Sequence, residues 1–303
     1  MFVLYKSYRM SKKIFVSFLL FLFVCHAQAQ PEYTAAIDNW HKTREEGLKK
    51  ENGWLNLAGL FWLKEGKNTF GADASNDLVF PQATIPGMAG YFELSGNTVT
   101  LVAEKDVVIT INQQPVHSYT VFHKDSVRAP VAAYGSLRWS VIRRDDKIGV
   151  RLRDLNSAVL SSFKGIERFP VDPAWKLEAS LQSTGQPDRI SITNVLGQTN
   201  LQPSAGKLIF TVNGKEYSLD ALDEGPELFV LFADASNGDA TYPSGRFLYV
   251  KKPDATGRTV IDFNKAYNPP CAFSPYATCP LPPKQNVLPV AVTAGEKKYE
   301  DGH

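Results

Sequence analysis

The sequence predicts a mainly β protein, built from antiparallel sandwich-like or barrel-like halves and one N-terminal α-helix. Aromatic residues make up 12% of the 303-residue chain, and Val, Ile and Thr are frequent, which favours strands. From residue 66 onward, turn signals recur at the spacing typical of a sandwich or barrel. Beyond the first thirty residues, the segment 35–50 has the clearest helical pattern, and Gly53 follows it.

Residues 1–29 are predicted to be an export signal. Basic residues precede an apolar run, 14–24, that is too short to span a bilayer. A small-x-small pattern at 26–29 then places the mature N-terminus near Gln30. A retained membrane anchor is the alternative; lipidation at Cys25 is disfavoured because Val24 stands where lipoprotein signals carry a small residue. We expect a soluble periplasmic or secreted protein, with no transmembrane segment after signal removal.

The net charge argues against two classes of partner. The chain has 33 Lys and Arg against 31 Asp and Glu, and the export signal holds four of the basic residues and none of the acidic ones. A nearly neutral mature surface gives no electrostatic footprint for nucleic acid or an anionic membrane, so we expect neither as a partner.

The elements follow in order along the mature chain. The segment 54–63 is apolar on both faces, so Trp54 and Trp62 are expected in the core rather than in a ligand site. An Asn-Gly pair at 213–214, between alternating stretches, predicts a tight hairpin. We expect strands at 68–71, 77–80, 91–94, 98–103, 107–112, 117–123, 137–143, 147–153, 176–182, 188–194, 207–212, 215–219, 227–233, 246–251 and 258–263.

Three short motifs within 66–117 occur in a familiar order: Asn-Thr-Phe-Gly (68–71), Asn-Asp-Leu-Val (76–79) and Thr-Ile-Asn-Gln-Gln-Pro-Val (110–116). This order resembles a forkhead-associated (FHA) sandwich. That family reads phosphothreonine through an Arg after the first Gly and a Ser and His in a later loop. Here Ala72 follows Gly71 and the later loop is Gly-Met-Ala-Gly. The resemblance implies a fold and argues against phosphopeptide recognition. We divide the mature chain into 30–155, the helix plus the FHA-like half, and 156–303, a second β half.

Polar residues gather at the predicted ends of three strands in the second half. If strands 227–233, 246–251 and 258–263 form an antiparallel meander, Asp234, Arg246, Asp262 and Asn264 converge at one rim. The rim would also receive Asn237, Tyr242, Tyr267 and Asn268. Arg246 is the expected hub, because its planar fork can hold one carboxylate and keep donors free for a ligand. A structural ion pair that pins a loop is the alternative.

A second polar cluster, Arg143, Arg151, Arg153 and Asp154, lies on a predicted hairpin. Arg151 and Arg153 share one face and could bind an anion, unless they belong to a solvated sheet face. Likewise, His117 and His123 could serve in acid–base chemistry or simply lie on an exposed face.

Cys271 and Cys279 lie in a Pro-rich loop of the most unusual segment, 261–283. A disulfide is the leading interpretation in an oxidising compartment, with free thiols or a metal site as alternatives. The spacing supports no metal site, and we expect no cofactor.

No Gly-x-Ser-x-Gly, His-Glu-x-x-His, P-loop or dinucleotide fingerprint is present. Five blocks, at 53–66, 163–170, 241–248, 262–283 and 294–297, resemble the bacterial and archaeal family known as domain of unknown function 1684. The resemblance carries no activity to transfer.

Three functional hypotheses remain. The first is binding of a small anionic or carbohydrate-like ligand at the rim around Arg246. The second is a hydrolase in which Asp234 or Asp262 acts as general base and Arg246 stabilises negative charge. The third is a structural or assembly role. The sequence alone leaves open whether the protein is an enzyme.

Overall fold

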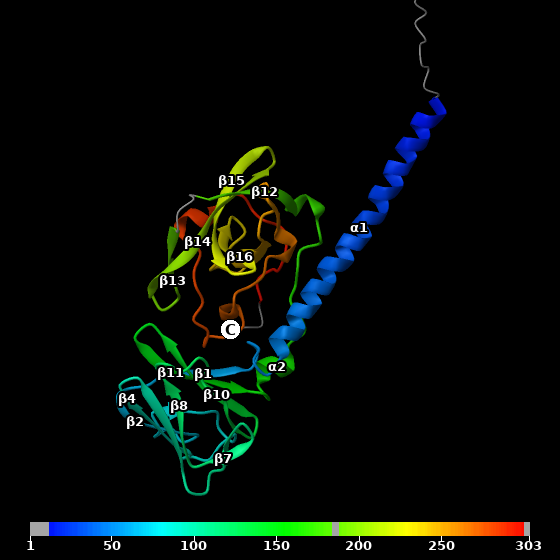
Figure 1. Ribbon diagram of the computed structural model, residues 1–303. Coiled ribbons are helices and arrows are strands. Elements are labelled where there is room, and N and C mark those ends of the chain that lie inside the picture. The colour runs from blue at the N-terminus through cyan, green and yellow to red at the C-terminus, as the bar shows by residue number, and fades with distance from the viewer. Residues whose placement is uncertain (1–11, 184–187, 300–303) are drawn as a thin grey trace, which may run out of the picture.

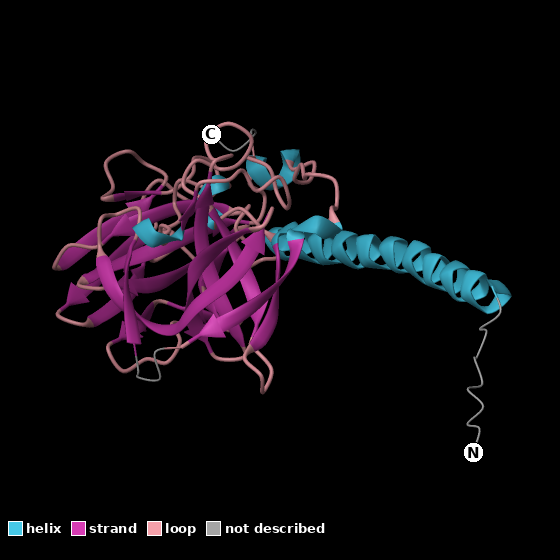
Figure 2. Cartoon of the chain, turned by 90° about the horizontal axis from the view of Figure 1, so that it is seen from above, coloured by secondary structure: helices cyan, strands magenta, loops and turns pink. Residues whose placement is uncertain are grey.

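The computed structural model describes residues 12–183 and 188–299. It confirms a mainly β protein with antiparallel sheets, in which a sandwich lies below a barrel-like sheet (Figure 1). One long helix, α1 (Lys12–Lys49), projects away from the β structure (Figure 2). Of the predicted export signal, 1–11 lie outside the described residues and 12–29 form the start of α1. Within the described ranges, no helix combines the length and apolarity needed to cross a bilayer.

The sandwich has two sheets. One has the order β1-β11-β10-β9-β6-β7, formed by Leu57–Trp62, Lys147–Asp154, Leu137–Arg144, Ala132–Tyr134, Ile109–Ile111 and Gln114–Val116. The other has the order β3-β2-β4-β5-β8, formed by Leu78–Val79, Gly66–Gly71, Gly90–Ser95, Thr98–Ala103 and Ser118–His123. Alternating apolar residues of both sheets form the core, where Phe70, Phe80, Phe92 and Trp139 pack together.

The barrel-like sheet has the order β17-β16-β15-β14-β12-β18. These strands are Arg246–Lys251, Glu227–Asp234, Lys215–Glu224, Thr199–Val212, Lys176–Gln182 and Arg258–Asp262. Contacts between β17 and β18 bring its two edges together. Two further strands, β13 (Asp188–Thr193) and β19 (Val287–Leu288), pair with β14 and β16. Its core includes Phe210, Phe232 and Phe263.

The predicted Asn-Gly hairpin is confirmed between β14 and β15. Val212 pairs with Lys215, and the two turn residues both have positive φ, 51° at Asn213 and 76° at Gly214. This is the conformation that a two-residue hairpin requires, and glycine adopts it without steric cost.

One local expectation held in part and one was wrong. The segment 54–63 was expected to be buried, and its central part forms β1 at the edge of the six-stranded sheet, with every residue of the strand buried or half-buried. The meander was expected to place β18 beside β16 and β17 in one ladder; instead β18 pairs with β12. The end of β18 still lies close to β17, because Phe247 of β17 exchanges backbone hydrogen bonds with Tyr267, just beyond β18.

Short helices and loops connect these bodies. A short helix, α2 (Ala158–Ser162), follows the sandwich. Single 3-10 turns lie at Pro173–Trp175, Phe263–Lys265, Pro270–Ala272 and Lys284–Asn286. The C-terminal chain from 263 onward, drawn in orange to red, runs across the barrel and the junction with the sandwich (Figure 1).

Candidate ligand-binding site

Arg246, the expected hub of the rim, lies inside the protein. Its side chain is 0% exposed, and one terminal nitrogen donates to Asp234 Oδ2 at 2.9 Å and to the carbonyl of Val292 at 2.9 Å. The other terminal nitrogen donates to the carbonyls of Ala294 and Glu296. The predicted ion pair with Asp234 is therefore present, but the terminal nitrogens are occupied by protein. This geometry corresponds to the alternative interpretation, an ion pair that holds a loop.

Asp234 and its neighbours are likewise hydrogen-bonded within the protein. Asp234 also accepts from the Val292 amide at 3.1 Å and from Ser236. The side chain of Asn237 closes the loop by contacting the backbone of Asp234 and of Tyr242. Asp234 therefore has hydrogen-bond donors around its carboxylate and does not face a cavity.

Asp262 and Asn264 hold helix α1 against the barrel. Tyr33 on α1 donates to Asp262 Oδ1 at 2.8 Å, and the Asn264 amide donates to Tyr33 Oη at 3.0 Å. His41 on α1 contacts the Asn264 carbonyl at 2.8 Å. Burial, followed by the hydrogen bond to Asp262, raises the pKa of Tyr33. Asp262 is thus in a structural contact rather than poised as a base.

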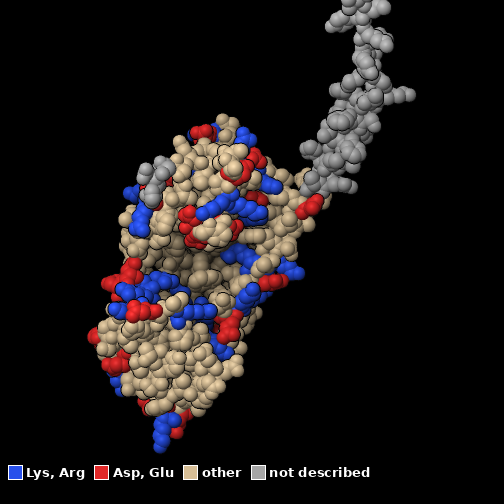
Figure 3. All heavy atoms as spheres, viewed as in Figure 1, with Lys and Arg blue, Asp and Glu red and all other residues tan. Residues whose placement is uncertain are grey.

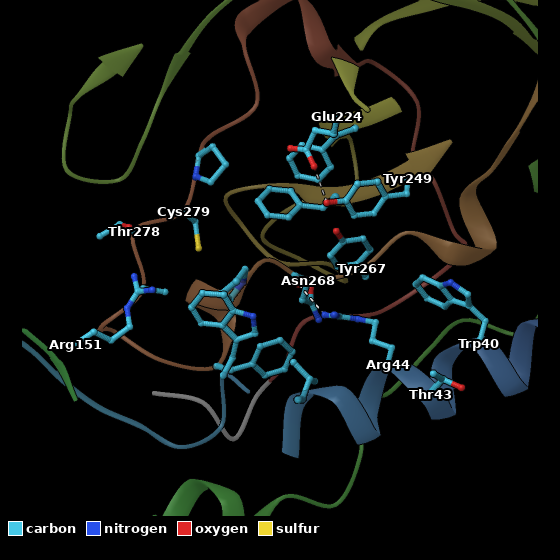
Figure 4. A pocket seen from close by; sticks show the side chains of 18 of the residues that line it. Trp40, Thr43, Arg44, Arg151, Glu224, Tyr249, Tyr267, Asn268, Thr278 and Cys279 are labelled. Atoms are coloured by element: carbon cyan, nitrogen blue, oxygen red, sulfur yellow. Dashed lines mark hydrogen bonds between the residues drawn. The ribbon is translucent and has the colours of Figure 1, made fainter. Parts of the chain in front are cut away.

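A mainly apolar cavity lies between the two β bodies, with a volume of about 560 Å³. Of the predicted rim residues, Tyr267, Asn268 and Cys279 line it, whereas Arg246, Asp234, Asp262, Asn264, Asn237 and Tyr242 do not. Figure 4 shows four sources of lining residues, from α1, the sandwich, the barrel and the C-terminal loop. They are Trp40, Thr43, Arg44, Leu48, Trp54, Arg144, Arg151, Glu224, Phe229, Phe247, Tyr249, Tyr267, Asn268, Pro270, Phe273, Ala277, Thr278, Cys279 and Pro280.

Arg151 is the most unusual of these residues. It is 8% exposed, its Nε has no hydrogen-bond partner, and within the described ranges its guanidinium meets no carboxylate. The guanidinium lies over the Trp54 ring, with its carbon 5.6 Å from the ring centroid. Burial, then the charges of Arg144 and Arg153, lower the pKa of Arg151 to about 10. A buried cation without a counter-ion is costly, and it is an arrangement suited to an incoming anion.

The register of β10 and β11 explains why Arg144 and Arg151 lie on the same wall of the cavity, the wall that the sandwich forms. Ser140 on β10 pairs with Arg151, and Arg144 pairs with Lys147, so Arg144 and Arg151 share the face opposite the sandwich core. Figure 3 shows Lys and Arg gathered around a hollow at the level of the junction. Arg144 Nε donates to Thr278 Oγ1 at 3.2 Å, which connects this face to the C-terminal loop.

The predicted Arg143, Arg151, Arg153 and Asp154 cluster is brought together only in part. Arg151 lines the cavity, whereas Arg143 is exposed and its Nε donates to the Asp145 carbonyl at 2.8 Å. Arg153 shares the face of Arg151 but points to the carbonyls of Asn52 and Gly53, and neither it nor Asp154 lines the cavity. Arg144 was missed, although alternation along β10 and β11 could have identified it.

Trp54 was expected in the core rather than at a ligand site, and it packs against two buried apolar clusters while it also lines the cavity. It is half-buried and contributes an aromatic surface to the cavity. Arg44 was also missed. Its guanidinium lies 4.3 Å from the centroid of the Tyr267 ring and donates to Glu296 and to the Asn268 carbonyl.

The barrel wall carries a polar group of its own. Tyr249 Oη donates to Glu224 Oε2 at 2.9 Å, and Tyr267 lies beside Tyr249 with nearly parallel rings. Burial, then the hydrogen bond to Glu224, raise the pKa of Tyr249 to about 12. Burial also raises the pKa of Tyr267. Both phenols therefore remain protonated at neutral pH and can donate or accept hydrogen bonds.

Cys271 and Cys279 form a disulfide, as the leading interpretation predicts, with their Cα atoms 6.1 Å apart. The loop that it closes contributes several cavity residues, including Ala277 and Thr278. His117 and His123 are both exposed, and neither lines the cavity. In the described part of the chain, no three His, Cys, Asp or Glu side chains are grouped as metal ligands would be.

Comparison with known proteins gives a family but no activity. Residues 161–297 match the family described as protein of unknown function (DUF1684). A solution NMR structure of an uncharacterized protein from Haloarcula marismortui is 34% identical over 45% of this chain and 78% of that chain, with a TM-score of 0.38.

Two FHA domain structures also match. One was analysed for phosphothreonine-dependent interactions, and the other is the FhaA FHA domain complexed with the intracellular domain of Rv3910. Each is 15% identical over 31% of this chain, covering 92% and 97% of the respective FHA chains, with a TM-score of 0.22. No curated protein matches the chain. The chain belongs to the family of proteins of unknown function DUF1684.

Proposed function

We propose that the protein binds a small organic anion in the cavity between its two β bodies. The observation that carries this proposal is Arg151, a buried guanidinium that lines the cavity and has no hydrogen-bonded partner on its Nε. Leaving a charge buried and unpaired costs free energy, so an arrangement of this kind is explained best by a bound counter-ion. Arg144 is the second cation on the same wall.

The remaining lining suits the body of such a ligand. Aromatic side chains surround the cavity and bury apolar surface, while a few polar groups fix orientation, which is the usual composition of a small-molecule site. The volume of about 560 Å³ lies within the range of roughly 300–1,000 Å³ found for such sites. The anion-binding role proposed for the rim thus moves from Arg246 to Arg151.

The two other hypotheses find less support. The hydrolase required Asp234 or Asp262 as a general base, but both carboxylates accept hydrogen bonds from the protein and neither lines the cavity. A structural role fits Arg246 and its partners well, yet it gives no reason for an unpaired Arg151.

Export is part of the proposal. A disulfide between Cys271 and Cys279 persists best in an oxidising compartment, which supports a periplasmic or secreted setting. Cell fractionation and N-terminal sequencing test this point. We expect soluble protein that begins near Gln30, and recovery of the intact chain from the cytoplasm would contradict it.

Titration with defined probes tests the binding function. Trp40 and Trp54 line the cavity, so ligand binding should change tryptophan fluorescence. We expect saturable binding of at least one of benzoate, phenyl phosphate and glucuronate. Arg151→Met should weaken it by about 30-fold or more, because a buried charged contact to a ligand is typically worth 2–5 kcal/mol.

Arg143→Met is the matched control, since Arg143 lies on the same hairpin, is exposed and does not line the cavity. It should bind the probes like the wild type. Binding that survives Arg151→Met unchanged, or a complete absence of binding across the three anions, would reject the proposed function.

A further inference from the structure

The barrel wall of the cavity offers a carboxylate, Glu224, on the side away from Arg151 (Figure 4). In Figure 4, Glu224 and Tyr249 come from barrel strands at the top, whereas Arg151 comes from the sandwich below. Glu224 accepts a hydrogen bond from Tyr249 Oη at 2.9 Å and is otherwise exposed at the cavity. A carboxylate has about four lone-pair sites, so Glu224 keeps several free to accept from a ligand.

The two walls of the cavity therefore require ligand groups of different chemistry. Arg144 and Arg151 require an acceptor with negative charge, while Glu224 repels such a group and requires a hydrogen-bond donor. A ligand that carries an acid at one end and hydroxyl groups at the other satisfies both walls in one orientation. A purely apolar acid would leave the Glu224 wall without a partner.

Aromatic rings line the barrel wall beside Glu224. Tyr249 and Tyr267 stack with centroids 6.3 Å apart and 16° between their planes, and Phe229 and Phe247 lie beside them. The electron-rich faces of such rings favour the weakly positive C–H faces of a saturated sugar ring, in the way that they favour positive edges of other rings.

We infer that the ligand is a hydroxylated ring acid of the sugar-acid class, an inference that rests on the proposed function. Its carboxylate binds Arg144 and Arg151, its hydroxyls donate to Glu224 and Tyr249, and its ring packs against the aromatic side chains. Glu224 is thus a specificity-determining residue that selects hydroxylated acids over apolar ones.

Three probes of similar size separate the contribution of the acid group from that of the hydroxyl groups. Glucuronate carries the acid and the hydroxyls, cyclohexanecarboxylate carries the acid alone, and glucose carries the hydroxyls alone. By calorimetric titration, we expect glucuronate to bind at least tenfold more tightly than either of the others. Arg151→Met should weaken both acids, and Glu224→Gln should weaken glucuronate about fivefold or more while leaving cyclohexanecarboxylate unchanged.

Glu227→Gln is the control for Glu224→Gln, because Glu227 is exposed nearby on the next strand but does not line the cavity. Circular dichroism and melting curves check that each variant is folded. If cyclohexanecarboxylate binds as tightly as glucuronate and Glu224→Gln changes neither, the sugar-acid inference is wrong while anion binding stands. If neither acid binds but benzoate or phenyl phosphate does, the sugar-acid inference is wrong while anion binding stands. If none of these anions binds, the inference and the proposed function both fail.

Discussion

Arg44 of helix α1 lies 2.6 Å from Glu296 in the C-terminal segment, measured from Nε to Oε1. Glu296 is 1% exposed and also accepts from the Asn268 amide at 2.7 Å. This contact joins helix α1 to the C-terminal segment. It also fixes the helical wall of the cavity, because Trp40 and Arg44 both line it.

Replacing Arg44 should destabilise the fold. Arg44→Met leaves the buried Glu296 carboxylate without its cation, which typically costs about 3–5 kcal/mol when one partner of a buried pair is removed. Denaturant unfolding measures the loss, with Lys42→Met as control, because Lys42 is an exposed residue on the same helix. A loss below about 1 kcal/mol for Arg44→Met would show that the contact matters little.

The stability that Glu296 contributes should depend on pH. Burial alone would raise its pKa, but the charge of Arg44, the neighbouring His41 side chain, and hydrogen bonds from Arg44 and the Asn268 amide hold the pKa of Glu296 below its ordinary value of 4.5. A carboxyl whose folded pKa is depressed contributes stability that is fully present above its unfolded pKa and is lost as pH falls through the folded pKa.

The difference in unfolding free energy between wild type and Glu296→Gln should therefore be constant near neutral pH. It should shrink once pH drops below about 4.5. Denaturant melts from pH 7 to pH 3 test this, and a difference that does not vary with pH would contradict the assignment.

Arg246→Met should loosen the C-terminal segment rather than act directly on a ligand. The substitution removes donors to the carbonyls of Val292, Ala294 and Glu296 and leaves Asp234 buried without its cation. We expect a loss of about 3–5 kcal/mol. Hydrogen exchange should show lost protection at the Val292 and Glu296 amides.

Lys251→Met, at an exposed position on the same strand, is the control for Arg246→Met. Full stability of Arg246→Met together with abolished ligand binding would restore Arg246 as a ligand-binding residue.

Removal of the disulfide should affect both stability and binding. A bond that closes so short a loop contributes about 2.5 kcal/mol in the chain-entropy model. Because Pro270, Ala277 and Thr278 in or beside this loop line the cavity, we also expect weaker probe binding in Cys271→Ala/Cys279→Ala. Melting with and without reductant measures the effect: reductant should lower the wild-type Tm and leave the double variant unchanged. Equal Tm values for both proteins in the absence of reductant would contradict this contribution.

The sequence predicts elements well where local patterns decide them. Alternation and turn residues place most strands, and the Asn213–Gly214 turn is correct because its backbone conformation is a local property. The contact between Asp234 and Arg246 is also predictable, since both residues lie at facing ends of neighbouring antiparallel strands.

The location of the cavity depends on contacts between distant segments. Arg246 is buried because the irregular segment 292–296 folds over it. No periodic pattern in the sequence predicts that packing. Likewise, only the docking of α1 and the Cys271–Cys279 loop onto the sandwich turns the exposed-looking Arg151 face into a cavity wall. The absence of a hydrogen-bond partner for Arg151 Nε can be recognised only once the neighbours of Arg151 in the fold are known.

If the cavity binds an anion, Arg151 is kept for that ligand at the expense of stability. The most direct test is the unfolding free energy of ligand-free Arg151→Met compared with wild type and Arg143→Met. Methionine keeps the apolar stem and removes the unpaired charge, so we expect Arg151→Met to be more stable than wild type by about 1–2 kcal/mol, with Arg143→Met unchanged. A loss of more than about 1 kcal/mol in Arg151→Met would mean that the guanidinium stabilises the fold, and the ligand-binding account would be contradicted.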